Sequence, residues 1–233
     1  MAEVRLSGAT HRYPGRHQPA LADVSLAIGP GITGIIGPNG AGKSTLFRLI
    51  AGVQEPDSGS VLIDGRKPRS YLSQHAIGLQ PEAPAFQEEL TVDEFLTGLA
   101  RLARSEPHFP FGTDELRTVR LGQLSLGQKR RVELAAALAG NTELILLDEP
   151  TNGLDPFAVI AFRDAVVASR VGNRTIIIAS HHLDELQRIV DHVVLLNQGK
   201  VDLSCSTSEV VQQYGSFDGL FREMAATATA TEG

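Results

Sequence analysis

The chain has 233 residues, of which 42% are hydrophobic and 21% charged, an ordinary composition for a globular protein with one large domain. A formal net charge of −6 argues against bulk electrostatic binding of nucleic acid, and the single cysteine, Cys205, excludes an internal disulfide. No apolar run approaches the about 18 residues of a transmembrane helix, and an N-terminus with Glu3 and no apolar core does not resemble a signal peptide.

The first part of the chain is predicted to be rich in β-strands. Short alternating segments at 3–13 and 21–29 are separated by a turn-rich link, and an apolar run at 32–37 ends in glycine, as a buried strand does. A helix is expected over 43–52, with a glycine at its end, and a further strand within 57–67.

Beyond an irregular, proline-containing region at 73–89, helices and apolar strands alternate, which is typical of a parallel sheet covered by helices. Thr91 and Glu94 have the spacing of a capping box, and 90–123 has little strand character and is interpreted as a helical insertion. The further expected elements are helix 90–103, loop 104–112, helix 126–140, strand 143–150, helix 156–170, strand 174–180, helix 183–191, hairpin 192–204, helix 208–215, a short helix from Phe217, and a disordered tail at 226–233.

The stretch GPNGAGKST lies between the apolar run and the first helix and matches the pattern G-x-x-x-x-G-K-[ST] in full. Glycines let backbone N–H groups approach phosphate oxygens, and the following helix presents unpaired N–H groups to the same anion. Lys43 can reach the terminal phosphates, and Ser44 can offer its hydroxyl to Mg²⁺. A glycine-rich turn is the alternative, but the flanking strand and helix favour nucleotide binding. The expected binding residues are Gly37, Asn39, Gly40, Ala41, Gly42, Lys43, Ser44 and Thr45.

Two carboxylates follow the apolar run of LILLDEP. Asp148 would lie at the carboxyl edge of the sheet beside the phosphate loop, where it can hold the Mg²⁺ shell. Glu149 adds a carboxylate that can orient and polarise an attacking water. An acidic helix start after a strand explains the pair equally well when it is considered alone.

Together with LSLGQ upstream and SHH downstream, these motifs resemble the ATP-binding cassette (ABC) ATPases, from Tyr13 to about Lys200. The resemblance implies an α/β fold: a P-loop NTPase core with a mostly parallel sheet, an N-terminal antiparallel β subdomain and a shortened helical subdomain. We expect a single domain over 1–225, with the helical subdomain at about 88–135.

LSLGQ corresponds to the family's signature LSGGQ, with Leu126 replacing the first glycine. Alone, it indicates a helix start capped by serine. In the family, this motif serves the nucleotide of a partner chain. The resemblance therefore implies a head-to-tail dimer, expected to be a homodimer, in which Ser125, Gly127 and Gln128 contact the nucleotide of the other copy.

Other residues match the family one at a time. Tyr13 matches the aromatic that stacks on adenine, although a strand-edge tyrosine is the alternative. Asp155 resembles the loop that crosses the dimer interface, and a helix N-cap before Pro156 is compatible with that role. His181 matches the histidine that contacts the γ-phosphate and water, with His182 a bystander. A metal site of the two is not expected, because neighbouring strand residues point to opposite faces.

The chain departs from the family at the loop that usually carries a glutamine. Aligning the proline places Glu82 there, with Gln80 as the alternative, and we expect Glu82 to join the metal shell. About forty residues separate Glu82 from Leu124, so the helical lobe should be reduced.

Three basic residues, Lys129, Arg130 and Arg131, follow the signature. Interface or phosphate contacts are one interpretation. For at least two of the three we prefer a solvated helix face.

The resemblance implies the ATPase subunit of an ABC transporter, which hydrolyses ATP to ADP and phosphate with Mg²⁺, with Lys43, Glu149 and His181 as catalytic residues. It implies separate integral membrane permease subunits, a cytoplasmic position on the inner face of the membrane, exporter-like two-component organisation and no nucleic-acid partner. The alternatives are a non-transport ABC ATPase acting on a macromolecular complex and a P-loop kinase, which leaves LSLGQ and His181 unexplained.

Overall fold

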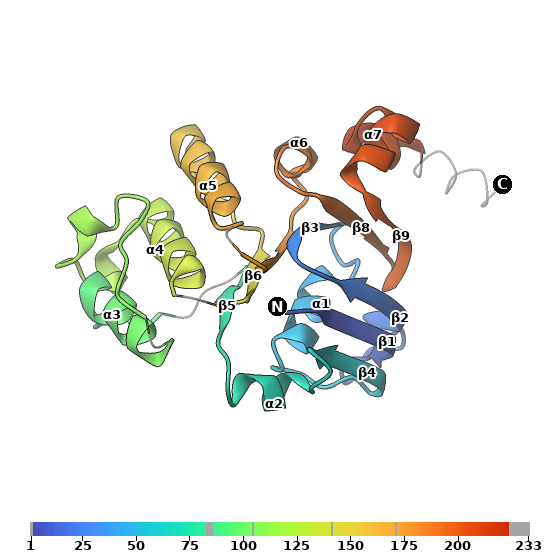
Figure 1. Ribbon diagram of the computed structural model, residues 1–233, viewed down its shortest axis with the longest axis horizontal. Coiled ribbons are helices and arrows are strands. Elements are labelled where there is room, and N and C mark those ends of the chain that lie inside the picture. The colour runs from blue at the N-terminus through green and yellow to red at the C-terminus, as the bar shows by residue number, and fades with distance from the viewer. Residues whose placement is uncertain (1, 83–85, 104, 141, 171, 224–233) are drawn as a thin grey trace.

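The computed structural model describes residues 2–82, 86–103, 105–140, 142–170 and 172–223 (Figure 1). The predicted disordered tail at 226–233 lies outside these residues. Within them, no helix is both long and apolar enough to cross a membrane.

The N-terminal sheet has three antiparallel strands in the order β2 (Leu21–Ile28), β1 (Val4–His11) and β4 (Ser58–Ile63). Buried and exposed side chains alternate along much of β1 and β2, so one face of this sheet packs on the core. The predicted antiparallel β subdomain is confirmed.

The central sheet has six strands, in the order β5 (Ile77–Gln80), β6 (Leu144–Asp148), β7 (Thr175–Ala179), β3 (Gly31–Ile36), β8 (His192–Asn197) and β9 (Lys200–Ser206). Neighbouring strands run parallel except β9, which pairs antiparallel with β8 as the predicted hairpin. The carboxyl ends of β3 and β6 therefore meet at one edge of the sheet, which brings the phosphate loop to the carboxylates.

Successive residues of the central strands face opposite layers. On one face, Leu144 and Leu146 pack with the N-terminal sheet and with α1 (Lys43–Ile50). On the other face, Ile145 and Leu147 pack with α4 (Leu126–Leu138), α5 (Pro156–Ala168), α6 (Leu183–Gln187) and α7 (Thr207–Tyr214). Because both faces are covered, every residue of β6 and β7 is buried.

A helical lobe lies at the far end of the molecule from the N-terminal sheet (Figure 1). Its helices, α3 (Val92–Leu102) and α4, enclose a third apolar cluster that includes Leu96 and Val132. The capping box predicted at the start of α3 is present: the Glu94 amide donates to Thr91 Oγ1 at 3.2 Å, and the Thr91 amide donates to Glu94 Oε2 at 2.8 Å. Two short 3₁₀ turns, Asp114–Leu116 and Leu121–Gln123, join the helices.

The expectation of irregular structure at 73–89 was wrong for β5, and a short helix, α2 (Pro68–Leu72), was also missed. Strand β5 has only four residues and pairs with β6 alone. A Cβ on Gly78 would lie 2.0 Å from the Ala137 carbonyl oxygen, so α4 approaches this strand at a distance that only glycine permits. Helix α6 ends at Gln187, earlier than the predicted 191.

Candidate active site

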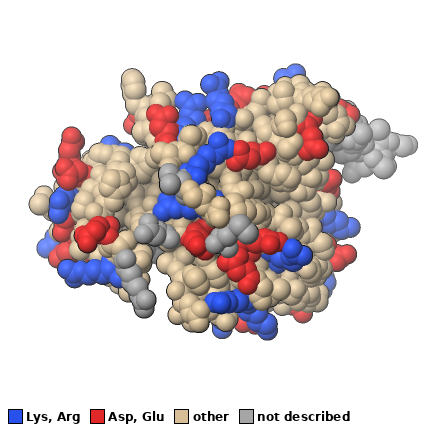
Figure 2. Space-filling model, viewed as in Figure 1, with Lys and Arg blue, Asp and Glu red and all other residues tan. Residues whose placement is uncertain are grey.

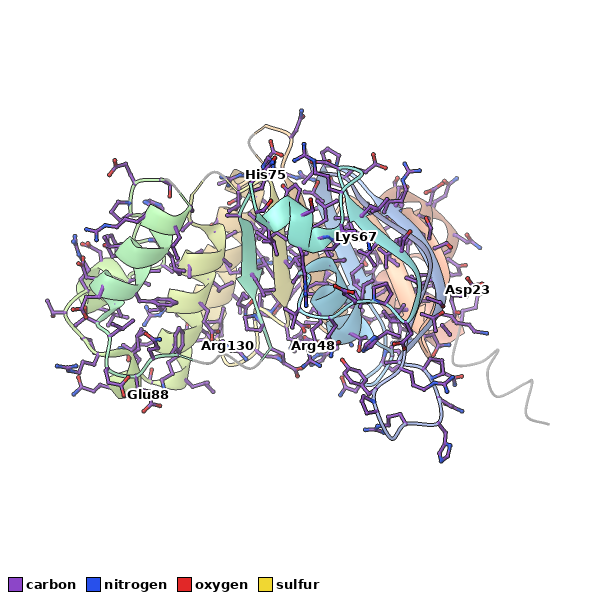
Figure 3. All side chains as sticks on the ribbon, turned by 90° about the horizontal axis from the view of Figure 1, so that it is seen from below. Asp23, Arg48, Lys67, His75, Glu88 and Arg130 are labelled. Carbon is purple, nitrogen blue, oxygen red and sulfur yellow. The ribbon has the colours of Figure 1, made fainter. Side chains whose placement is uncertain are left out.

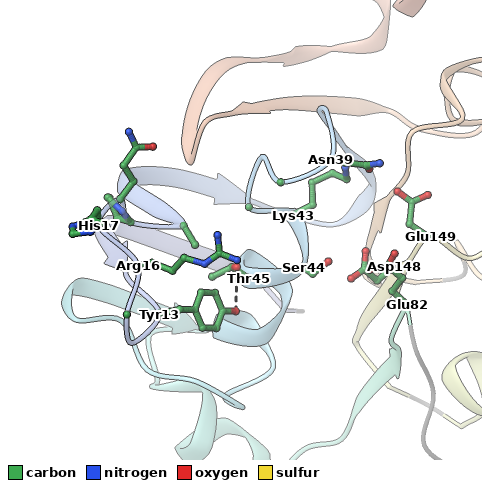
Figure 4. A pocket seen from close by; sticks show the side chains of 16 residues that line it. Tyr13, Arg16, His17, Asn39, Lys43, Ser44, Thr45, Glu82, Asp148 and Glu149 are labelled. Atoms are coloured by element: carbon green, nitrogen blue, oxygen red, sulfur yellow. Dashed lines mark hydrogen bonds between the residues drawn. The ribbon is translucent and has the colours of Figure 1, made fainter.

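A pocket of about 720 Å³ opens at the carboxyl ends of β3 and β6 (Figure 4). The phosphate loop, the two strand-end carboxylates and the β1–β2 link line it. The predicted site residues among its walls are Tyr13, Asn39, Gly40, Gly42, Lys43, Ser44, Thr45, Glu82, Asp148 and Glu149. Gly37 and Ala41 lie in the loop but do not line the pocket.

Two glycines of the phosphate loop have no room for a side chain. Gly42 has φ 107°, and a Cβ there would lie 2.5 Å from the Ala20 carbonyl oxygen. A Cβ on Gly37 would lie 2.1 Å from the Leu196 carbonyl oxygen. Gly42 caps α1 without a side-chain hydrogen bond, and the first turn of α1 holds no acidic residue. The N–H groups at this helix start are therefore open to an anion.

The Lys43 ammonium group is held over the loop. It donates to the carbonyl oxygens of Gly37 at 2.7 Å and Pro38 at 3.3 Å, and the residue is only 7% exposed. A buried cation beside a helix N-terminus gives this end of the pocket the charge that a polyphosphate requires.

Asp148 is buried in the pocket wall, with 4% of its surface exposed. Burial raises its pKa to about 6, a hydrogen bond from Ser44 opposes the shift, and the neighbouring carboxylates of Glu82 and Glu149 add to it. Its Oδ1 atom is buried and has no hydrogen-bond partner among the residues that the structure describes. A bare carboxylate oxygen beside a hydroxyl and a second carboxylate fits a hard cation such as Mg²⁺. The residues that would hold it are Ser44, Asp148 and Glu82.

Protein groups alone would not complete that coordination. Over the described parts of the chain, no three His, Cys, Asp or Glu side chains form a metal-binding cluster. A cation here would take further oxygens from phosphate and water, which is how Mg²⁺ binds in phosphoryl-transfer sites.

Glu149 is held in a strained conformation at φ 51°, in the left-handed region that few non-glycine residues adopt. Its amide donates to the Ala179 carbonyl oxygen at 2.8 Å, and its Oε2 lies 2.9 Å from His181 Nδ1. The His181 amide lies 3.3 Å from the same oxygen. The side chain of Glu149 is 6% exposed and that of His181 is 48% exposed. Glu149 lines the pocket, whereas His181 is not among the described residues of its walls and contacts it through Glu149.

The expectation that His181 and His182 point to opposite faces was wrong. Their ring centroids lie 4.2 Å apart, because β7 ends at Ala179 and both residues lie in the link between β7 and α6. His182 Nε2 lies 3.1 Å from Asn152 Oδ1.

The structure separates the two candidates for the loop residue. Gln80 is fully buried at the end of β5 and does not line the pocket, whereas Glu82 does. The geometry therefore favours Glu82 as the residue that faces a bound metal.

Tyr13 is fixed to α1 by its hydroxyl group. This group lies 3.2 Å from Thr45 Oγ1, donates to Gln54 Oε1 at 3.1 Å and accepts from Arg48 at 2.9 Å. Burial raises the pKa of Tyr13, but the hydrogen bonds to Thr45 and Arg48 and the charge of Arg48 outweigh it, so the net shift is downward. With the hydroxyl bound, the ring forms part of the pocket wall, next to Arg16 in Figure 4.

The remainder of the β1–β2 link was missed as part of the site. Residues 15–20 all line the pocket, including the basic residues Arg16 and His17. The only signal in the sequence is that they directly follow Tyr13.

The signature residues lie outside this pocket. Ser125 caps α4, and it exchanges hydrogen bonds with Gln128 at 2.9 and 3.3 Å. Asp155 caps α5 by accepting from the amides of Phe157 and Ala158. Gly127 lies beside them at the start of α4, so within one chain these residues begin helices and none reaches the phosphate loop's pocket.

Arg130 does not lie on a solvated helix face. It is 7% exposed and pairs with Glu133 at 3.0 Å. Lys129 and Arg131 are partly exposed, and Arg131 donates to the Phe111 carbonyl oxygen at 3.4 Å. The solvated-face interpretation, preferred for at least two of the three residues, therefore does not apply to Arg130.

Residues 21–152, more than half of the chain, match the family described as ABC transporter. The chain belongs to the ABC transporter family and has the fold of its ATP-binding subunits. A solved structure of an ATP-binding subunit of an ABC transporter superposes with a TM-score of 0.84 at 28% identity, covering 95% of this chain and 99% of that one.

Two curated relatives come from Escherichia coli (strain K12). The chain is 30% identical over 228 residues to the lipopolysaccharide export system ATP-binding protein LptB, covering 91% of this chain and 94% of LptB. It is 36% identical over 213 residues to the probable multidrug ABC transporter ATP-binding protein YbhF, covering 86% of this chain. The match spans only 37% of the length of YbhF.

Proposed function

We propose that this chain binds ATP, hydrolyses it to ADP and phosphate, and thereby powers a transporter through separate membrane subunits. The observation that carries the proposal is that the buried Glu149 carboxylate, which lines the same pocket as Lys43, pairs with His181 at 2.9 Å. A base, a partner that orients it and a phosphate-binding cation are the groups that hydrolysis of a triphosphate requires.

Each side chain has a defined part in this reaction. Lys43 and the N–H groups at the start of α1 bind the phosphates, and Tyr13 packs against the adenine ring. Glu149 receives a proton from the attacking water. At the same time the water oxygen bonds to the γ-phosphorus, and the bond between that phosphorus and the bridging oxygen of ADP breaks. His181 orients Glu149 and donates to the developing charge. Mg²⁺, when held by Ser44, Asp148 and Glu82, supplies neutralisation of phosphate charge.

We further propose that two copies of the chain close head to tail. Ser125, Gly127 and Gln128 form a second helix start suited to an anion, yet they lie outside the pocket of their own chain. In a head-to-tail pair, these residues and Asp155 would complete the site of the opposite copy. The capping hydrogen bonds of Ser125 would then compete with the incoming phosphate.

The membrane subunits would dock on the helical lobe. A second pocket of about 380 Å³ lies between β5 and α3, with Leu79, Phe86, Phe95, Leu99 and Leu102 among its walls. Leu102 is 81% exposed, so this region presents apolar surface to a partner. Docking there would place the chain on the inner face of the membrane.

We propose that residues 1–225 act as one cassette, with the helical part at about 88–135 inserted into it, and that the organisation is exporter-like. Figure 2 shows acidic and basic side chains interspersed over the visible face, without the continuous basic patch that is typical of nucleic-acid binding. A non-transport ABC ATPase remains the second candidate, and co-purification with a multi-span membrane protein would separate the two.

The test of the proposed activity is release of inorganic phosphate from ATP without any acceptor. Purified chain should release phosphate with Mg²⁺ and stop doing so in the Glu149→Gln variant. Transfer of phosphate to an acceptor instead would identify a kinase and contradict the proposal.

A further inference from the structure

Arg130 joins the signature helix to the loop that carries Glu82. Its guanidinium group donates to the Pro81 carbonyl oxygen at 3.3 Å and to the Glu82 carbonyl oxygen at 2.5 Å. Arg130 lies on the second turn of α4, only five residues from Ser125, while Glu82 is 48 residues away along the chain. Figure 3 places Arg130 at the junction of the helical lobe and the central sheet.

Arg130 is itself buried and paired with a carboxylate, while its bonds to the loop carbonyls are partly buried. Arg130 is 7% exposed and Glu133 is 5% exposed, and their side chains meet at 3.0 Å. Nη1 of Arg130 is shared between Glu133 and the Pro81 carbonyl oxygen, and Nη2 donates to the Glu82 carbonyl oxygen. Those donors point to two consecutive carbonyl oxygens, which fixes the backbone of the loop rather than one side chain.

The Glu82 side chain extends from that fixed backbone into the nucleotide pocket beside Asp148. A movement of α4 relative to the central sheet would therefore displace Glu82 with it. Among the described residues, Arg130 is bonded to both the helix that begins at Ser125 and the loop that lines the pocket.

We propose that Arg130 is a positioning residue that sets the distance of Glu82 from a bound metal and transmits displacement of the signature helix to it. The inference rests on the proposed function of the pocket and deepens it. Groups behind a metal ligand commonly change metal affinity by about tenfold or more when removed. The same size of effect is expected here, although Arg130 acts through backbone carbonyls.

The experiment measures the affinity of a fluorescent ATP analogue, trinitrophenyl-ATP, once in EDTA and once in Mg²⁺. The ratio of the two affinities reports the metal-dependent part of binding without any turnover. The main variant is Arg130→Met/Glu133→Met, which removes the carbonyl donors without leaving a buried charge unpaired. The second variant is Arg130→Lys, because an ammonium group cannot donate in a fork to both carbonyls.

Two controls are matched to this design. Lys129→Met and Arg131→Met each remove an adjacent, partly exposed cation of α4, and Arg131 bonds to Phe111 instead. We expect affinity in EDTA to be unchanged in every variant. The ratio should fall roughly tenfold in the main variant, partly in Arg130→Lys, and stay at the wild-type value in both controls.

The same substitutions in a Glu82→Gln background test whether Arg130 acts through Glu82. If Arg130 acts through Glu82, Arg130→Met/Glu133→Met should cause no further loss of the ratio in that background. An unchanged ratio in the main variant and in Arg130→Lys, or a full additional loss in the Glu82→Gln background, would overturn the inference. A wild-type chain that binds no nucleotide would instead overturn the proposed function.

Discussion

Glu149 and His181 lie 32 residues apart in the chain, yet Oε2 of the glutamate and Nδ1 of the histidine meet at 2.9 Å. The contact forms because β6 and β7 are adjacent parallel strands that end at the same edge of the sheet. Asp148 pairs with Ala179 in that register, so the residues just beyond them face one another. This contact predicts that Glu149 acts as the catalytic base and that His181 orients it.

Replacement of His181 by alanine should lower kcat by roughly 10²- to 10³-fold and leave nucleotide affinity within about threefold of wild type. The reason is that the histidine contacts the base rather than the phosphate-binding loop. Phosphate release and nucleotide titration measure the two quantities. His182→Ala is the matched control, since its ring bonds to Asn152, and it should change kcat little. Equal losses in both variants would contradict the assignment.

Asp148 predicts a pH dependence of the metal-free protein. Its folded-state pKa is raised from 3.8 to about 6, so the folded state holds a proton that the unfolded state has released over that window. Stability from this group is present below about pH 4 and is lost as the pH rises through 6, by roughly 3 kcal/mol. Asp148→Asn should therefore unfold at a higher temperature than wild type at pH 8 without metal, measured by calorimetry.

With Mg²⁺ and ATP added, wild type should instead unfold at a higher temperature than Asp148→Asn. Wild type gains stability from binding, whereas Asp148→Asn should gain much less because the amide cannot replace the carboxylate at a cation. If Asp148→Asn lowered the melting temperature at pH 8 without metal, the burial of an uncompensated charge would be refuted.

Gly42→Ala should abolish nucleotide binding and destabilise the protein by about 1–3 kcal/mol, because the residue has φ 107° and its new Cβ would meet the Ala20 carbonyl oxygen. Thermal unfolding and nucleotide titration measure both effects. Gly98, inside α3, has open space around it, so Gly98→Ala should instead stabilise the chain by up to about 1 kcal/mol. Tight nucleotide binding by Gly42→Ala would show that the loop is not the phosphate site.

The sequence was sufficient to predict the parts of the site that depend on local order. The phosphate loop joins β3 to α1, and Asp148 ends a buried strand, as expected from the apolar runs and the motifs. The capping box at Thr91 and the serine cap at Ser125 could also be predicted, because the partners of each cap lie within four residues. These features need no knowledge of distant segments.

The features that were missed depend on distant contacts. Strand β5 is four residues long and lies in a polar segment, and its identity as a strand comes from pairing with β6 and from the approach of α4 to Gly78. Arg130 is buried because carbonyl oxygens 48 and 49 residues away face it, which no periodicity in α4 reveals. The two histidines lie side by side because the strand ends before them.

The central claim is that the pocket of one chain is completed by the signature residues of another. The most direct measurement is phosphate release per chain as the protein is diluted, with the fraction of dimer followed in parallel by sedimentation. The account predicts that the rate per chain falls in step with the dimer fraction, and that Glu149→Gln accumulates as a dimer with ATP and Mg²⁺. A rate per chain that stays constant when only monomer remains would contradict it.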